Sequence, residues 1–183
     1  MRRAFRLPRP PLPRFAVAWF PAFEAMDRVE ALRKRHDPAW HLVPAHLTLV
    51  FPFATALTAL QIETHVRRVV ATWPAVPVTF RRPRLHANEF IFLMASRGAA
   101  SITALHDALY TRSLRTHLRS DIPYEPHITV ARNPDFASLE RALEETEEAL
   151  AGEYADVMRE VTLLDVAADG KITSLKTFPL DTA

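Results

Sequence analysis

Two short stretches of the sequence place the same two chemically active residue types at the same spacing. In "HLTL", His46 is followed by Thr48, and in "HITV", His127 is followed by Thr129. Residues two positions apart on a β-strand point to the same face of the sheet. Each stretch therefore predicts a His and a Thr side by side on one face, while the apolar residues between them pack against the other face.

Two such pairs suit the chemistry of a phosphodiester. Displacement at phosphorus needs one group that takes a proton from the attacking oxygen and another that gives a proton to the leaving oxygen. A His can do either, because its unperturbed pKa is about 6.5, and a Thr hydroxyl can donate to a non-bridging oxygen. We therefore expect His46 and His127 to act as general acid and base, Thr48 and Thr129 to bind the phosphate, and the reaction to need no metal and no cofactor.

A purely structural role for these residues is the alternative. A single His on a strand, followed by Thr, is commonly a surface residue or a hydrogen-bonded core residue. Here the pattern occurs twice, and each copy lies just after a proline, Pro44 or Pro126. The repetition favours a functional role.

Hydrophobic periodicity and the positions of proline and glycine divide the chain into strands and helices. The expected strands cover 14–20, 46–51, 76–82, 90–95, 126–131, 158–168 and 171–180. The expected helices cover 22–36, 56–73, 99–114 and 136–152.

The order β-α-β-α-β thus occurs twice, with a His-Thr pair on the middle strand each time. We expect an α+β fold built from two pseudo-repeats, at about 14–82 and 89–168, within one domain at 14–183. A duplicated unit of this kind can set its two equivalent strands side by side in one cleft. Residues 1–13, rich in proline and arginine, are expected to be an extended lead-in.

The composition limits the class of protein. Hydrophobic residues make up 49% of the chain and charged residues 24%, which is typical of a folded soluble domain, and the net charge of +2 is too small for a general nucleic-acid coat protein. The lack of cysteine excludes disulfides, thiolate metal sites and a Cys nucleophile. No apolar run approaches the roughly 20 residues that span a membrane, and no signal peptide is recognisable. We expect a cytoplasmic monomer with no membrane partner.

The two motifs, and "PHITVAR" around the second, resemble the two-histidine (2H) phosphoesterase superfamily, in particular its bacterial 2′-5′ RNA ligase-like, cyclic phosphodiesterase branch. The resemblance extends from about residue 14 to the end of the chain. It implies a bilobal fold in which two antiparallel sheets form a central cleft. It also implies action on 2′,3′-cyclic phosphates or 2′-5′ linkages in RNA ends or nucleotides, in the hydrolytic direction or as reversible ligation, with His46 and His127 as the acid/base pair and Thr48 and Thr129 as phosphate binders.

Three further residues are weaker candidates for contacts with the substrate. Tyr124 could stack on a base, and Arg112 and Arg115 could steer phosphates toward the cleft. The two arginines could equally be solvated or could interact with a helix C-terminus. A metal site made from His36, His41 and His46 is disfavoured, because a spacing of five does not place side chains on one helix face.

Two rival functions remain open on the sequence. A non-catalytic module could bind RNA or a nucleotide in the same cleft, and a protein of a third class could use the motifs only structurally, in an interaction domain. The presence of both His and both Thr disfavours the binding-only alternative. Incubation with a 2′,3′-cyclic nucleotide would discriminate between them.

Overall fold

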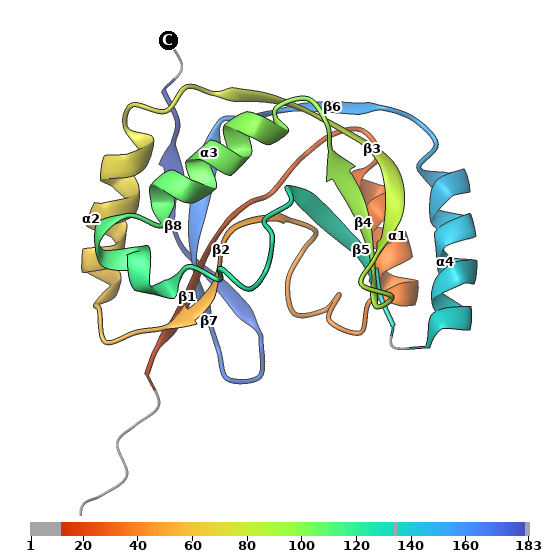
Figure 1. Ribbon diagram of the computed structural model, residues 1–183, viewed down its shortest axis with the longest axis horizontal. Helices are drawn as coiled ribbons and strands as arrows, with labels where there is room; N and C mark the ends of the chain where they lie inside the picture. Colours follow the sequence, from red (N-terminus) through yellow and green to blue (C-terminus); the bar gives the residue numbers. More distant parts are fainter. Residues whose placement is uncertain (1–11, 134, 182–183) are drawn as a thin grey trace, which may run out of the picture.

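A computed structural model describes residues 12–133 and 135–181 (Figure 1). The lead-in expected at 1–13 lies almost wholly outside the described residues. The strands are β1 (Arg14–Trp19), β2 (Leu47–Ala54), β3 (Val76–His86), β4 (Phe90–Ala95), β5 (His127–Arg132), β6 (Tyr154–Met158), β7 (Glu160–Val166) and β8 (Ile172–Pro179). The helices are α1 (Met26–His36), α2 (Ala59–Val70), α3 (Ala99–Leu109) and α4 (Phe136–Ala149), with a 3₁₀ helix η1 (Arg112–His117) after α3.

The strands form one antiparallel sheet in the order β6-β3-β4-β5-β2-β1-β7-β8. Two separate sheets were expected, and the structure joins them. The join is the pairing of β2 with β5, which consists of Leu47 opposite Ile128. The two strands that carry the His-Thr motifs are therefore the two central strands, with three further strands on each side.

One strand of the structure was not predicted. The strand expected at 158–168 corresponds to β7 (Glu160–Val166), and only Met158 of it belongs to β6 (Tyr154–Met158), the strand before it. The two strands pair with β1 and β3 respectively, at opposite sides of the sheet. As a result β3 belongs to the side of β4 and β5, while β7 and β8 complete the side of β1 and β2.

The helices cover the sheet in pairs. In Figure 1, α2 and α3 lie beside the strands of one side, and α1 and α4 lie together beside the other. Contacts join α1 to β5, α4 to β3 and β4, α3 to β2, and α2 to β8. Local capping defines two of the starts: Thr58 and Gln61 form a reciprocal capping box on α2, and Asp135 accepts from the Ser138 N–H at the start of α4.

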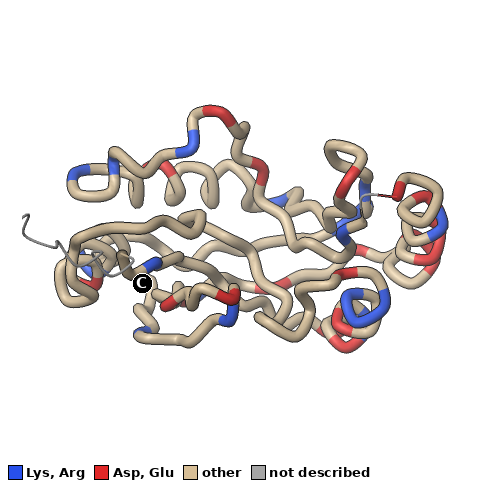
Figure 2. Tube along the Cα trace, turned by 90° about the horizontal axis from the view of Figure 1, so that it is seen from below, with Lys and Arg blue, Asp and Glu red and all other residues tan. Residues whose placement is uncertain are grey.

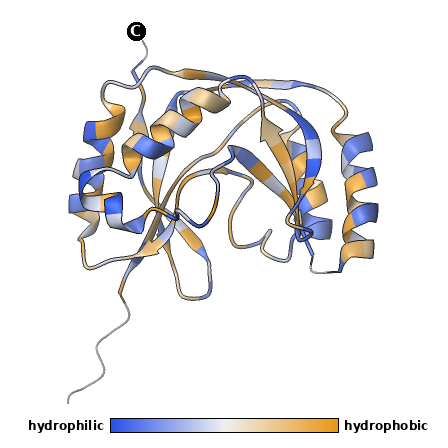
Figure 3. Ribbon diagram, viewed as in Figure 1, coloured by the Kyte–Doolittle hydropathy of each residue, from blue (hydrophilic) through white to orange (hydrophobic). Residues whose placement is uncertain are grey.

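The central strands have the two chemically different faces that the sequence predicted. Leu47, Leu49, Ile128 and Val130 are fully buried in the main core, where the helices pack. Thr48, His127 and Thr129 alternate with them and are only partly buried. Figure 3 shows the same contrast in the helices, which are hydrophobic on one side and hydrophilic on the other. Within the described part of the chain, no helix has both the length and the apolar character required to cross a bilayer.

Candidate active site

The pairing of β2 with β5 brings the two motifs together. Leu47 lies opposite Ile128 in antiparallel register, so one residue further in each direction sets Thr48 opposite His127 and His46 opposite Thr129. Side chains directly opposite one another have Cβ atoms about 5 Å apart, and diagonal neighbours are about 7–8 Å apart. The two His thus occupy one diagonal of a four-residue group and the two Thr occupy the other, as an acid and a base on opposite sides of one phosphate require.

Each imidazole is held by the same kind of hydrogen bond. His46 Nδ1 donates to the Pro44 carbonyl at 2.8 Å, and His127 Nδ1 donates to the Glu125 carbonyl at 2.5 Å, in both cases the residue two positions earlier. A carbonyl oxygen can only accept, so the proton of the neutral ring resides on Nδ1. This leaves Nε2 of both rings as the atom that can take up or release a proton.

The two Thr hydroxyls are free to bind a ligand. Several other Thr side chains are already occupied: Thr64 donates to Leu60, Thr146 donates to Ala142, and Thr162 bonds to Thr177. Thr48 and Thr129 have no protein hydrogen-bond partner for their hydroxyls among the described residues, and both are partly exposed.

A buried arginine fixes the loop that leads into His46. Arg33 of α1 is 2% exposed, and its guanidinium donates to the Val43 carbonyl at 2.9 Å and to Asp37 at 3.2 Å. Glu30 accepts from the Ala45 N–H at 2.5 Å and also contacts Arg33. The helix thereby holds the chain on either side of Pro44, the carbonyl that orients His46. The sequence does not reveal this group, because a Glu, an Arg and an Asp on an amphipathic helix are usually solvated.

The second His is supported by an aromatic stack. The ring of Phe92 in β4 lies parallel to His127 at 3.5 Å between centroids, and His86 stacks on Phe92 at 4.6 Å. Glu125, whose carbonyl holds His127, forms an ion pair with Arg84 and lies 3.5 Å from His86 Nδ1. The ring of His127 is therefore restrained by packing on its face as well as by its hydrogen bond.

Burial makes both His weaker bases than usual. It lowers the pKa of His127 to about 4, with smaller contributions from the positive charges of His86 and His46. Burial also lowers the pKa of His46, and the nearby Arg33 acts in the same direction. Both rings are consequently neutral at pH 7 in the free protein.

Tyr124, one of the weaker candidates, serves the framework in this structure. Its hydroxyl donates to the Thr48 carbonyl at 2.8 Å, and one face of its ring stacks on His106 at 3.6 Å. Two neighbours also bond to the backbone of β2: His106 Nδ1 donates to the Leu49 carbonyl at 2.7 Å, and the Phe51 N–H donates to the Tyr110 hydroxyl at 2.9 Å. These side chains satisfy backbone groups of β2 along the part of the strand where no further pairing with β5 is recorded.

The arginines Arg112 and Arg115 lie on η1, outside the four-residue group, and both are exposed. Arg112 lines a pocket with residues of α2, and Arg115 is absent from its lining. Across the described ranges, no three His, Asp or Glu side chains are gathered as a metal site would require.

Comparison with known proteins points to one family. The profile of the 2′-5′ RNA ligase superfamily matches residues 21–169. A Bacillus pumilus protein named "Putative phosphoesterase" is 31% identical over 65% of this chain and 70% of its own length. A Geobacillus kaustophilus protein of similar name is 24% identical over 84% of this chain and 80% of its own.

Solved structures share the fold. Escherichia coli LigT in complex with 3′-AMP superimposes with a TM-score of 0.64 at 20% identity, over 93% of this chain and 99% of that one. The same LigT has been solved with ATP and with NADP+, with TM-scores of 0.62 and 0.60. The mixed α/β fold with its antiparallel strands is therefore the fold of these LigT structures, which contain bound nucleotides.

Proposed function

The chain belongs to the 2′-5′ RNA ligase superfamily of phosphoesterases, and from this premise we propose that it cleaves, or reversibly forms, 2′,3′-cyclic phosphate or 2′-5′ phosphodiester bonds at RNA ends or in nucleotides. His46 and His127 are the general acid and base, and Thr48 and Thr129 bind the phosphate. The observation that carries the proposal is the diagonal arrangement of the two His across the β2–β5 pair. The nucleotide complexes of LigT support the ligand class.

Hydrolysis of a cyclic phosphate follows from this arrangement. Water attacks phosphorus while Nε2 of one neutral His takes the proton of the water, and the bond from phosphorus to one ribose oxygen breaks. The other His, in its protonated form, gives its Nε2 proton to that oxygen. The Thr hydroxyls donate to the non-bridging oxygens, where negative charge increases in the transition state. In ligation, the 5′-hydroxyl of a second RNA end attacks phosphorus in place of water, one His takes its proton, and the other His gives a proton to the 3′ oxygen as it leaves. The reverse of this step, with the acid and base roles exchanged, cleaves the 2′-5′ bond.

One His must be protonated to act as the acid, but both rings are neutral in the free protein. A bound phosphate raises the pKa of the neighbouring imidazole, because an anion favours the charged form of the ring. Substrate binding thus prepares one His as the acid, and the second His remains a neutral base because two adjacent positive charges disfavour each other.

A single assay tests the proposal and its rival. The protein is incubated with a 2′,3′-cyclic mononucleotide and with a 2′-5′ dinucleotide in the presence of EDTA, and the products are separated. Cleavage that is lost in both His46→Ala and His127→Ala supports the proposal. Binding of the nucleotides without any turnover would instead establish a non-catalytic nucleotide-binding module.

A further inference from the structure

Helix α2 and the 3₁₀ helix η1 enclose a pocket of about 510 Å³ apart from the His-Thr group. Gln61, Thr64 and Arg68 recur along one face of α2, and Arg112 and Ser113 complete the pocket from η1. Leu57, Leu60 and His65 form the rest of the lining, which thus includes two guanidinium groups and no carboxylate. A cavity of this size and composition suits an anion that accepts several hydrogen bonds.

The donors in this pocket are available. Neither Arg68 nor Arg112 has an ion-pair or hydrogen-bond partner within the ranges that the structure describes. Gln61 uses its carbonyl oxygen to accept from the Thr58 N–H at 2.9 Å, so its amide NH₂ group can still donate. A pocket near α4 is a useful contrast: Arg81 and Arg82 line it, but so do Glu147 and Glu153, and Arg81 is paired with Glu153.

The backbone of Arg112 is strained. Its φ is +48°, a left-handed conformation that is uncommon for a residue with a side chain. Arg82 has a similar φ, but it lies at an irregularity in the β3–β4 pairing, which explains its conformation. Arg112 begins η1, directly after the turn that follows α3, where glycine would adopt this φ without strain, and strained residues are concentrated at functional sites.

We infer that Arg68 and Arg112 form a second phosphate subsite, which binds an internal backbone phosphate of an RNA strand whose end lies at the His pair. This inference rests on the function proposed above. The ring of Phe53, at the far end of β2, contacts His117 of η1 at 4.6 Å between centroids. Thr48 and Phe53 are five residues apart on β2, about 16 Å in an extended strand, so a ligand that extends from the His pair to η1 must be longer than a mononucleotide.

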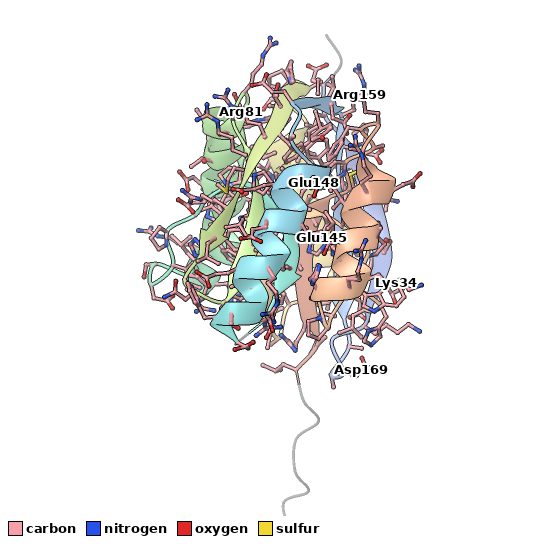
Figure 4. All side chains as sticks on the ribbon, turned by 90° about the vertical axis from the view of Figure 1, so that its right-hand side faces the viewer. Lys34, Arg81, Glu145, Glu148, Arg159 and Asp169 are labelled. Carbon is pink, nitrogen blue, oxygen red and sulfur yellow. The ribbon has the colours of Figure 1, made fainter. Side chains whose placement is uncertain are left out.

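The charges of the helices favour an RNA strand that runs from the His pair toward η1 and α2. In the other half of the sheet, α4 carries Glu140, Glu144, Glu145, Glu147 and Glu148. Figure 2 shows acidic residues along this helix, and Figure 4 labels Glu145 and Glu148 on it. An RNA backbone is repelled from such a surface. The surface of α2 and η1 presents Arg68 and Arg112, which attract a phosphate.

The test is a binding comparison that needs no turnover. Fluorescence anisotropy measures the Kd of a labelled eight-nucleotide RNA ending in a 3′-phosphate and, by competition, that of a nucleoside 3′-phosphate. We expect Arg68→Gln and Arg112→Gln each to weaken RNA binding about tenfold and to lower the slope of log Kd against log salt by about 0.7. Binding of the mononucleotide should change less than twofold.

Two further variants serve as controls. Arg67→Gln removes the same charge from the neighbouring position of α2, which does not line this pocket, and should leave RNA binding within twofold. Arg112→Gly suits the positive φ, so it should preserve or raise the melting temperature while weakening RNA binding like Arg112→Gln.

The inference is overturned if Arg67→Gln weakens RNA binding as much as Arg68→Gln does, or if RNA binds no more tightly than the mononucleotide. Failure of the proposed function is a separate result, recognised by absence of turnover on every substrate of the assay above. Binding at the second subsite can be read in either case.

Discussion

At the scale of single residues, the matching Nδ1 bonds of His46 and His127 have the largest chemical consequence. Because both rings present Nε2, either His is chemically able to be the acid or the base, as a reversible reaction requires. In the proposed mechanism, their depressed pKa values set the pH at which the pair is active. An unperturbed pKa of about 6.5 would give an optimum near neutrality, and burial moves the expected optimum to lower pH.

The first prediction concerns the pH dependence of turnover. The profile of kcat/KM reports the free protein, so its optimum should lie in the acidic range, between about 4, the pKa of His127, and the unperturbed value of about 6.5. The profile of kcat should be displaced toward neutral pH, because bound phosphate raises the pKa of one ring. Each limb belongs to the pair, not to one residue. Initial rates from pH 4 to 9 measure both profiles, and a kcat/KM that rises steadily to pH 9 would exclude a protein acid.

The second prediction separates the Thr from the His. Thr48→Val and Thr129→Val keep the β-branched shape that suits a strand but remove the hydroxyl donor. Each should lower kcat/KM by roughly one to two decades, which corresponds to about 1.5–3 kcal/mol for a hydrogen bond to a charged group, with an unchanged pH optimum. Thr162→Val, which removes a hydroxyl bonded to Thr177, is the control and should leave the kinetics unchanged. Altered melting temperatures with normal kinetics in the Thr48 and Thr129 variants would remove these hydroxyls from the site.

At the scale of elements, α1 does more than cover the sheet. Through Arg33 and Glu30 it holds the loop between Asp37 and Ala45, and so it determines where the Pro44 carbonyl lies. Figure 4 shows α1 beside α4, and outward-facing residues of α1 join the two helices: Arg35 and His36 both bond to Glu145. The inward and outward faces of one helix thus have separate roles.

The third prediction tests the inward face. Arg33→Lys keeps the charge but loses the planar fork that reaches Val43, Asp37 and Glu30 together. We expect kcat to fall about tenfold with little change in KM, because a looser loop misorients His46 without altering the Thr hydroxyls. The pH profile should also shift, because the pKa of His46 depends on burial and on the hydrogen bond to the Pro44 carbonyl. Arg35→Lys on the exposed face is the matched control, and equal effects from both variants would contradict a positioning role.

The strands of the site could be predicted from the sequence, because the alternation of polar and apolar residues that indicates them lies within a few neighbouring positions. Alternation in "HLTL" and "HITV" placed each His and Thr on one face, and the structure has that alternation. Arg33 could not be found this way, because its partner Val43 depends on how the chain returns past the end of α1. Tyr124 was read as a platform for a base, but its hydroxyl has a partner on β2 that only the register of the folded sheet supplies. The helix expected at 99–114 ends at Leu109, since the chain turns at Tyr110 before η1.

At the scale of the whole molecule, burial of His residues should make the protein sensitive to acid. His46, His106 and His127 all have lowered pKa values because they are buried. The unfolded chain binds protons on these rings near pH 6.5, and the folded protein binds them only at lower pH. Between these values the unfolded state holds more protons, so stability falls as the pH falls.

The fourth prediction gives this effect a size. The stability that depends on His127 should be fully present above pH 6.5 and should be lost as the pH falls from 6.5 to about 4, by about 3 kcal/mol. Urea unfolding at pH 7.5, 5.5 and 4.5 measures the loss. His127→Asn can still donate to the Glu125 carbonyl but does not titrate, so its stability should depend less on pH. An equally steep dependence in this variant would assign the effect to other groups.

The exchange of strands between the two sides of the sheet also governs how the protein can be made. When a ribosome has released the first half of the chain, β1 lacks its neighbour β7, β2 lacks β5, and β3 lacks β6. The side of β4 and β5 is complete only once β6 has emerged as far as Met158, and the side of β1 and β2 only once β7 and β8 have followed. The first half of the chain therefore cannot complete either side by itself during synthesis, as a domain of a multidomain protein can. The unpaired edge of β1 remains open to other chains throughout that interval. The His-Thr group therefore reaches its final geometry only after three strands that follow it in the sequence have emerged and paired.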